Sequence, residues 1–306
     1  MAVHPHIQYL EQKSIDRSRW DECIGRSPNG LVYAYSFYLD ALADNWDALV
    51  LNDYEAVMPL PWRKKYGVQY IYQPLFAAQL GLFGNNLSAQ LLNDFFKAVP
   101  KKFRYWDFTL NHANVFALDR YPMQLRSNYV LSLEKDHSSL HSAYRENIRR
   151  NIKKALSYGC TTSTGIPVKD IINLTLQFSA DRSVDPQSLR RFEGLYETLD
   201  QQELAKTYGV LSKEGQLLSS CVFFFSHKRA YYILVGNHPN GRTLGASHLL
   251  IDAFIKDHAS QPLLLDFEGS DLRNLAFFYS SFGAVEEKYA SIKLNRLPWF
   301  LKWMKR

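Results

Sequence analysis

The sequence predicts an α+β protein of two domains, each a mixed, mostly antiparallel sheet flanked by helices. Two observations predict this class. First, the chain of 306 residues is 46% hydrophobic and 22% charged, enough for a large core and longer than one ordinary domain. Second, each half shows helices, a meander of short strands, a helix and a strand in the same order. No residue-level repeat joins the halves, so we place the domains at 1–134 and 135–306 from the order of elements alone.

The first half is predicted to open with two short helices. Between Ile15 and Asp47 apolar residues recur at helical spacing, and the turn residues 27–30 interrupt the pattern. A strand meander, a helix and further strands follow. In order, we predict strands over 47–51, 54–61 and 68–72, a helix over 88–99, and strands over 103–110 and 127–133.

The second half is predicted to open with one long amphipathic helix over 138–158. Leu140, Tyr144, Ile148 and Ile152 form one apolar stripe, and Gly159 suits a helix end. A meander and two further helix and strand pairs follow. In order, we predict helices over 168–180 and 186–199, strands over 207–212, 217–226 and 229–235, a helix over 246–258, a strand over 262–267, a helix over 272–282 and a strand over 285–294.

The net charge of +6 is unevenly divided between the halves. Through Leu133 there are 13 Lys and Arg against 12 Asp and Glu, and the remainder holds 23 against 18. The second half is therefore the better candidate to bind a polyanion such as coenzyme A or RNA. The alternative is an ordinary basic surface exposed to solvent.

The chain start and the cysteines bear on location. The start lacks a basic segment followed by an apolar one, and no run of about 18 apolar residues exists to span a bilayer. Cys23, Cys160 and Cys221 are odd in number and widely spaced, which favours reduced thiols over disulfides or a metal site. We expect a soluble, cytoplasmic protein without a metal; the oligomeric state is not predicted.

A small-residue loop between a predicted strand and helix carries the sharpest signal. His238 to Ser247 reads HPNGRTLGAS, and a helix start leaves backbone N–H groups free to bind an anion. Arg242-x-x-Gly245-x-Ser247 resembles the pyrophosphate loop of the GNAT acyltransferases, with Ser247 departing mildly from its last position. The alternative is an ordinary turn. The resemblance implies that acyl-coenzyme A, expected to be acetyl-coenzyme A, is bound by Arg242, Thr243, Leu244, Gly245, Ala246 and Ser247.

The strand before this loop adds a second expectation. In GNAT proteins it carries a bulge that parts two strands into a V, where the pantetheine arm pairs with exposed backbone. Val235 and Gly236, followed by Asn237, occupy that place, and a glycine suits a bulge or a close ligand approach. A simple strand end is the alternative.

Two more segments supply candidate catalytic residues. Asn274 to Ala284 is similar to the GNAT segment in which Asn and Ala precede a Tyr, which implies that Asn274 binds the cofactor and Tyr279 protonates the departing thiolate. Asp266 and Glu268 share one strand face by alternation, and Glu268 is our candidate general base for the amine. The alternatives are a core aromatic for Tyr279 and a helix cap for Glu268.

A basic segment at 144–155 resembles the helix that opens the C-terminal half of FemAB-type transferases. Arg145, Arg149, Arg150 and Lys153 are our candidate substrate-binding residues, since such a stripe binds phosphates. The alternative is a solvated helix face.

The combined resemblance implies a tandem GNAT-like, FemAB-type protein. Its first half would be a degenerate GNAT-like domain and its second half would hold the cofactor. The function expected first is transfer of an acyl group from acyl-coenzyme A to a small-molecule or peptidyl amine. The alternatives are aminoacyl-tRNA-dependent transfer to a peptidoglycan precursor and a non-catalytic binding module on the same scaffold.

Overall fold

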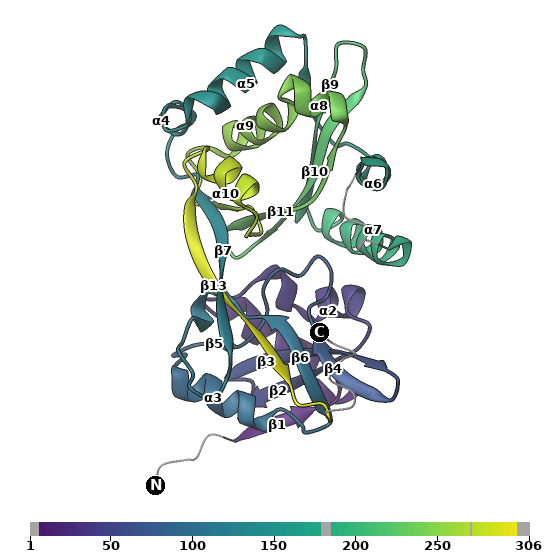
Figure 1. The fold of residues 1–306 in the computed structure, drawn as a ribbon, viewed down its shortest axis with the longest axis vertical. Coiled ribbons are helices and arrows are strands. Elements are labelled where there is room, and N and C mark those ends of the chain that lie inside the picture. The colour runs from purple at the N-terminus through teal and green to yellow at the C-terminus, as the bar shows by residue number, and fades with distance from the viewer. Residues whose placement is uncertain (1–5, 179–184, 270, 299–306) are drawn as a thin grey trace. The chain divides into compact units, whose positions relative to one another are not determined.

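The computed structural model describes residues 6–178, 185–269 and 271–298 and divides into two compact units. Met1–Arg126 with Lys288–Arg306 form the N-terminal unit, and Ser127–Glu287 form the C-terminal unit. Each unit contains a mixed, mostly antiparallel sheet flanked by helices, so the predicted α+β class is confirmed (Figure 1).

The division differs from a single break after residue 134. Strands β7 (Met123–Ser132) and β13 (Val285–Asn295) each pass from one unit into the other. Val130–Ser132 of β7 pairs within the C-terminal unit, whereas Ser291–Asn295 of β13 pairs within the N-terminal unit. Strand pairing therefore places the boundaries between the units within β7 and β13, and the second part of β13 belongs to the N-terminal unit.

The N-terminal unit has the sheet order β1-β2-β3-β4-β6-β13, with β5 beside β3. Its pairs are antiparallel except β4 with β6. The predicted break at 27–30 is confirmed, because it separates α1 from η2 and α2. The elements are β1 (Ile7–Leu10), η1 (Gln12–Ser14), α1 (Arg17–Arg26), η2 (Val32–Ala34), α2 (Ser36–Leu42), β2 (Trp46–Leu51), β3 (Ala56–Lys65), β4 (Val68–Tyr72), β5 (Phe83–Gly84), α3 (Ala89–Ala98), β6 (Phe103–Thr109) and η3 (His112–Asn114).

The C-terminal unit has the sheet order β7-β12-β11-β10-β9-β8, in which β11 and β12 are parallel. Helices α6 and α7 lie on one side of the sheet and α5 and α9 on the other (Figure 1). The elements are α4 (His137–Ser142), α5 (Glu146–Ser157), β8 (Thr161–Thr164), α6 (Val168–Phe178), α7 (Pro186–Asp200), β9 (Ala205–Leu211), β10 (Leu217–Ser226), β11 (Arg229–Asn237), α8 (Pro239–Leu244), α9 (Ala246–His258), β12 (Leu264–Asp266) and α10 (Arg273–Ser280).

The single helix predicted over 138–158 is wrong, because the chain leaves helical geometry at Arg145. That residue is extended, with φ −63° and ψ 153°, and its N–H donates to the carbonyl of Ser281 at 2.9 Å. Tyr144 just before it is buried, and its hydroxyl donates to Asp252 Oδ1 at 3.1 Å. Tertiary contacts thus divide the predicted helix into α4 and α5.

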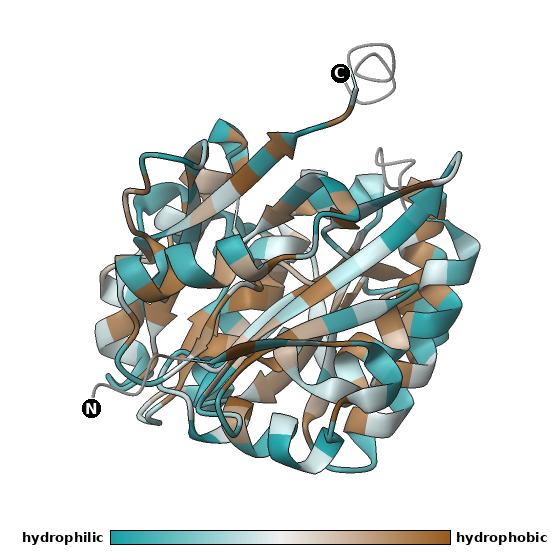
Figure 2. Ribbon diagram, turned by 90° about the horizontal axis from the view of Figure 1, so that it is seen from below, coloured by the Kyte–Doolittle hydropathy of each residue, from teal (hydrophilic) through white to brown (hydrophobic). Residues whose placement is uncertain are grey.

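Each unit has its own apolar core. In the C-terminal unit α5 contributes Ile148, Ile152 and Ala155, and α9 contributes a wider set including Leu250 and Phe254. Apolar and polar segments alternate along the helices and strands, as expected of elements that bury one face (Figure 2). The helix predicted over 168–180 is described to Phe178, since Ser179 and Ala180 lie outside the described residues. None of the described helices is long and apolar enough to span a bilayer.

Candidate active site

The two edges of β11 differ, and this difference defines the candidate site. On one edge β10 pairs with β11 from Arg229 to Asn237. On the other edge β12 pairs only with Arg229–Tyr231. Apart from β10, no described strand pairs with β11 beyond Tyr231. Strands β11 and β12 therefore part, as the predicted V requires.

The irregularity in β11 lies two residues before the predicted position. Pairing shifts between Val222 and Phe223 of β10, which leaves Ile233 without an opposite residue. The expected bulge at Val235 to Asn237 is therefore wrong. Gly236 instead lies close to α6, because a Cβ there would lie 3.0 Å from Leu174 Cβ.

The backbone of Val235 faces the open edge of β11. His238 N–H donates to Leu218 O on β10 at 2.9 Å. Because backbone groups alternate along a strand, Gly236 also faces β10 while Val235 faces away from it. The N–H and C=O of Val235 are thus placed to pair with an extended ligand.

The expected open loop after β11 is instead the short helix α8. The His238 side chain accepts a hydrogen bond from Asn240 N–H, and its carbonyl accepts from Gly241 N–H at 2.9 Å and Arg242 N–H at 3.3 Å. Gly245 N–H in turn bonds to Gly241 O. The expectation that these amides are free is wrong, because the helix uses them itself.

The first turn of α9 retains part of the predicted anion site. Ala246 and Ser247 are its first two residues, where N–H groups lack carbonyl partners within their own helix. The Ser247 hydroxyl is engaged, since it donates to Asn237 Oδ1 at 2.6 Å. Arg242 and Thr243 are exposed on α8, and Leu244 is half-buried. Because Ala246 is fully buried, the amide of half-buried Ser247 and the exposed guanidinium of Arg242 are what remains for a diphosphate.

Helix α5 packs directly against this turn. Gly245 is left-handed, with φ 83°, and a Cβ there would lie 2.6 Å from Asn151 O on α5. Lys154 Nζ donates to Thr243 O at 2.8 Å. The glycine is thus required both by its own conformation and by the approach of α5.

Tyr279 is buried at the base of the V. Its ring stacks on Phe267, which directly follows β12, with centroids 4.5 Å apart. Phe267 also contacts Tyr232, the first residue of β11 beyond its pairing with β12, at 6.1 Å. Burial first, and then the charge of Glu268, raise the pKa of Tyr279, so the phenol keeps its proton at neutral pH.

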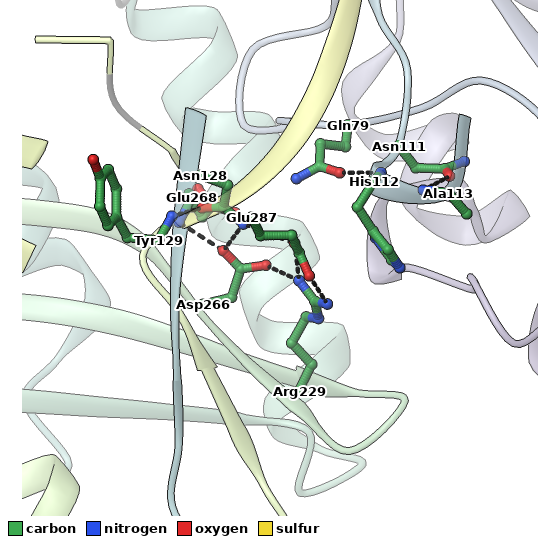
Figure 3. Close-up of polar contacts among 10 residues, drawn as sticks. All are labelled: Gln79, Asn111, His112, Ala113, Asn128, Tyr129, Arg229, Asp266, Glu268 and Glu287. Carbon is green, nitrogen blue, oxygen red and sulfur yellow. Dashed lines mark hydrogen bonds and ion pairs between the residues drawn. The ribbon is translucent and has the colours of Figure 1, made fainter. Parts of the chain in front are cut away.

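Glu268 lies within electrostatic reach of Tyr279, but it does not continue the strand. Strand β12 ends at Asp266, and Glu268 is left-handed with φ 60°. The predicted shared face of Asp266 and Glu268 is therefore wrong. Asp266 is only 1% exposed and bonds to Asn128 and Arg229, whereas Glu268 is half-buried (Figure 3).

The remaining predicted residues lie at the surface. Asn274 is exposed in the first turn of α10. Arg145 precedes α5, with its guanidinium 4.8 Å from the ring centroid of Phe277. Arg149 makes one long bond, from Nη1 to Ser142 O at 3.4 Å, and Arg150 and Lys153 are exposed on α5. The four cations thus share a segment but not one continuous helix.

Sequence reasoning missed Arg229, Asn128 and Glu287, which surround Asp266. A local signal for two members exists, since Arg229 opens an apolar strand and Asp266 closes another. Charges at the ends of buried strands usually have partners. Among the described residues, no group of three or more His, Cys, Asp or Glu is placed to hold a metal ion.

Comparison with known proteins identifies the domain type. Residues 142–273, all within the C-terminal unit, match the family model described as acetyltransferase (GNAT) domain. A search of curated proteins returned no match.

Solved structures share the fold over both units. FemX aligns with a TM-score of 0.64 at 13% identity, covering 92% of this chain and 96% of its own. A conserved protein of unknown function from Bacteroides thetaiotaomicron gives 0.60 at 12%, covering 94% and 99%. A tandem GNAT protein from the clavulanic acid biosynthesis pathway gives 0.55 at 13%, covering 96% and 99%. These likenesses show the fold, a tandem of two GNAT-like domains.

Proposed function

We propose that this tandem GNAT-like protein is an N-acyltransferase that moves an acyl group from acyl-coenzyme A to an amine. One observation carries the proposal: β11 and β12 part after Tyr231, with Tyr279 at the base of the opening. The open edge of Val235 offers one N–H and one C=O, which suits the amide groups of a pantetheine arm.

The diphosphate of coenzyme A fits the C-terminal unit in part. Ser247 supplies an N–H group in the first turn of α9, where the helix dipole favours negative charge. Arg242 is exposed on the adjacent α8 and supplies a cation. We propose that these groups, rather than the whole 242–247 loop, bind the diphosphate.

The reaction needs one proton removed and one supplied. Glu268 accepts a proton from the attacking amine as the nitrogen bonds to the thioester carbonyl carbon. The carbon–sulfur bond then breaks, and Tyr279 gives its proton to the departing sulfur. These transfers leave Glu268 protonated and Tyr279 ionised, and a proton passing between them resets the site.

Binding and transfer of acetyl-coenzyme A test the proposal. We expect saturable binding by calorimetry, weakened by Arg242→Glu, and transfer to members of an amine panel by mass spectrometry. Tyr279→Phe should lower kcat by about 10²–10⁴-fold, the usual worth of a general acid, with KM for the donor little changed. Tyr208→Phe is the matched control, since Tyr208 is also a buried phenol but donates to Asp257 Oδ2. No binding refutes the proposal, and binding without transfer favours a non-catalytic module.

A second candidate, transfer from aminoacyl-tRNA, is supported by the hydrogen bonds within α8. They occupy amides that a diphosphate would need, while Arg150 and Lys153 stay exposed on α5. This candidate predicts tRNA binding that falls steeply with salt and weakens when Arg149, Arg150 and Lys153 become Ala. Replacing Lys64, Lys65 and Lys101, three exposed cations of the N-terminal unit, removes the same charge as a control. Binding of tRNA that is insensitive to salt excludes this second candidate.

A further inference from the structure

A buried polar network joins four strands at the place where β11 and β12 part. Asn128 comes from β7, Arg229 from β11, Asp266 from β12 and Glu287 from β13 (Figure 3). Arg229 Nη1 lies 2.7 Å from Asp266 Oδ2 and 2.9 Å from Glu287 Oε2, and its Nη2 lies 2.9 Å from Glu287 Oε1. Asn128 Nδ2 donates to Asp266 Oδ1 at 2.9 Å.

Stability alone is a weak explanation for this network. The side chains of Arg229 and Asp266 are 9% and 2% exposed, so both ions lose most of their hydration. Buried ion pairs are often no more stabilising than apolar side chains of similar volume, and some instead fix one specific geometry. The geometry fixed here is that of the chain leaving β12.

Asp266 also accepts a hydrogen bond from the chain segment that follows β12. Glu268 N–H donates to Asp266 Oδ1 at 2.8 Å. Glu268 and Gly269 are consecutive left-handed residues, with φ 60° and 82°. A left-handed residue other than glycine costs about 1–2 kcal/mol, so the surroundings must hold Glu268 in that conformation.

We infer that Asp266, immobilised by Arg229 and Asn128, is a positioning residue that fixes the left-handed turn at Glu268 and so holds that carboxylate beside Tyr279. The inference rests on the proposed function, in which Glu268 accepts the proton of the amine. Asp266 itself touches no substrate in this scheme, because it is buried and its carboxylate bonds to Asn128, Arg229 and the N–H of Glu268.

Amide hydrogen exchange of the full chain tests the turn without any substrate. Asp266→Ala removes the acceptor of Glu268 N–H, and we expect that amide to exchange at least about tenfold faster. Asp266→Asn keeps a side-chain oxygen and should restore exchange to within about threefold of the native rate. Asn128→Ala serves where Asp266→Ala fails to fold, because it loosens Asp266 without leaving Arg229 short of a carboxylate. Unchanged exchange in the folded variants overturns the inference.

A double-mutant cycle then connects the turn to catalysis. With acetyl-coenzyme A and the amine panel, Asp266→Ala should lower kcat at least about tenfold and leave KM for the donor within twofold. In a Glu268→Gln background the same substitution should cost nothing further. Equal losses in both backgrounds show a merely structural role and overturn the inference. Full activity of Glu268→Gln alone instead removes Glu268 from the proposed function, while the exchange measurement still tests the turn.

Discussion

The parallel strand pair of the N-terminal unit is closed, whereas that of the C-terminal unit is open. Strand β4 pairs with β6 up to its last residue, Tyr72 opposite Asp107. The chain then returns to the end of β6, where Leu80 N–H donates to Thr109 O at 3.2 Å. Strand β11, by contrast, continues to Asn237 after its pairing with β12 has stopped at Tyr231.

Both units thus contain a parallel strand pair in a mostly antiparallel sheet, but among the described strands only the pair of the C-terminal unit has an opening between its members. An opening between parallel strands requires one strand to run on unpaired, and β4 has 5 residues where β11 has 9. In the N-terminal unit a buried cluster of Asn29, Asn111 and Asn114 also binds the returning chain around Leu82 O. We therefore expect the donor to bind in the C-terminal unit alone.

Removing Asn111 from the asparagine cluster should give the largest effect on stability. Asn111 is fully buried, donates to Leu80 O and Leu82 O, and accepts from Ala113 N–H. Asn111→Ala should lower the free energy of unfolding by about 2–6 kcal/mol, because Leu80 O and Ala113 N–H each lose their bond to Asn111 and a stranded buried polar group costs about 1–3 kcal/mol. Urea unfolding measures it. The folded variant should bind acetyl-coenzyme A with unchanged Kd, and a lost affinity would contradict the division of roles.

Gly245→Ala should rank next, because the contact with α5 leaves no space for a side chain. Left-handed strain and the overlap with Asn151 O together predict a loss of about 2–5 kcal/mol in unfolding free energy. Gly215→Ala is the matched control, since Gly215 has φ 81° but no atom within 4 Å of the added Cβ. The control should lose only about 1–2 kcal/mol, and equal losses would show that α5 does not press on the turn.

The pH dependence of stability tests the packing of α9 against α10. Burial lowers the pKa of His248 to about 4 from 6.5, and its ring meets Phe278 edge to face at 5.0 Å. The unfolded chain therefore binds the proton more readily, and stability falls as pH drops from 6.5 towards 4. The slope from this group is at most about 1.4 kcal/mol per pH unit. His248→Gln should reduce the dependence of the unfolding free energy on pH in that window, while His6→Gln, at an exposed position, should not.

Val235→Pro should give the smallest effect and the most specific one. It removes the N–H on the open edge of β11 and leaves the hydrogen bonds to β10 in place. We expect Kd for acetyl-coenzyme A to rise about 3–10-fold, the worth of one hydrogen bond of 0.5–1.5 kcal/mol, with little change in unfolding free energy. The N–H of Leu234 faces β10 instead, so Leu234→Pro removes a hydrogen bond of the sheet and should cost about 1–3 kcal/mol of stability. Unchanged donor affinity for Val235→Pro would show that the open edge is not used.

Elements whose pattern is local could be predicted from the sequence. Strands β4 and β10 and helix α9 have the predicted bounds. The break before α5 could not be predicted, because Tyr144 stays in phase with the apolar stripe while Arg145 bonds to distant Ser281. Helix α8 was missed although Pro239 at its first position, after His238 as N-cap, is a helix-start signal.

The candidate site divides in the same way. Glu268 and Tyr279 could be named as candidates from a strand end and a family resemblance, but the left-handed turn at Glu268 could not be predicted. That turn depends on Asp266, whose partners Asn128 and Arg229 are 138 and 37 residues away along the chain. Alternation along a strand holds only while the strand lasts, and β12 stops at Asp266.

The exchange of strands between the units bears on how the protein can be taken apart. A polypeptide of residues 135–306 would carry 291–295 without β6, and one of residues 1–134 would keep β6 without that partner. Both fragments would expose strand edges able to pair with other chains. Dissection of the two halves therefore calls for a permuted gene in which the last strand is rejoined to the first unit.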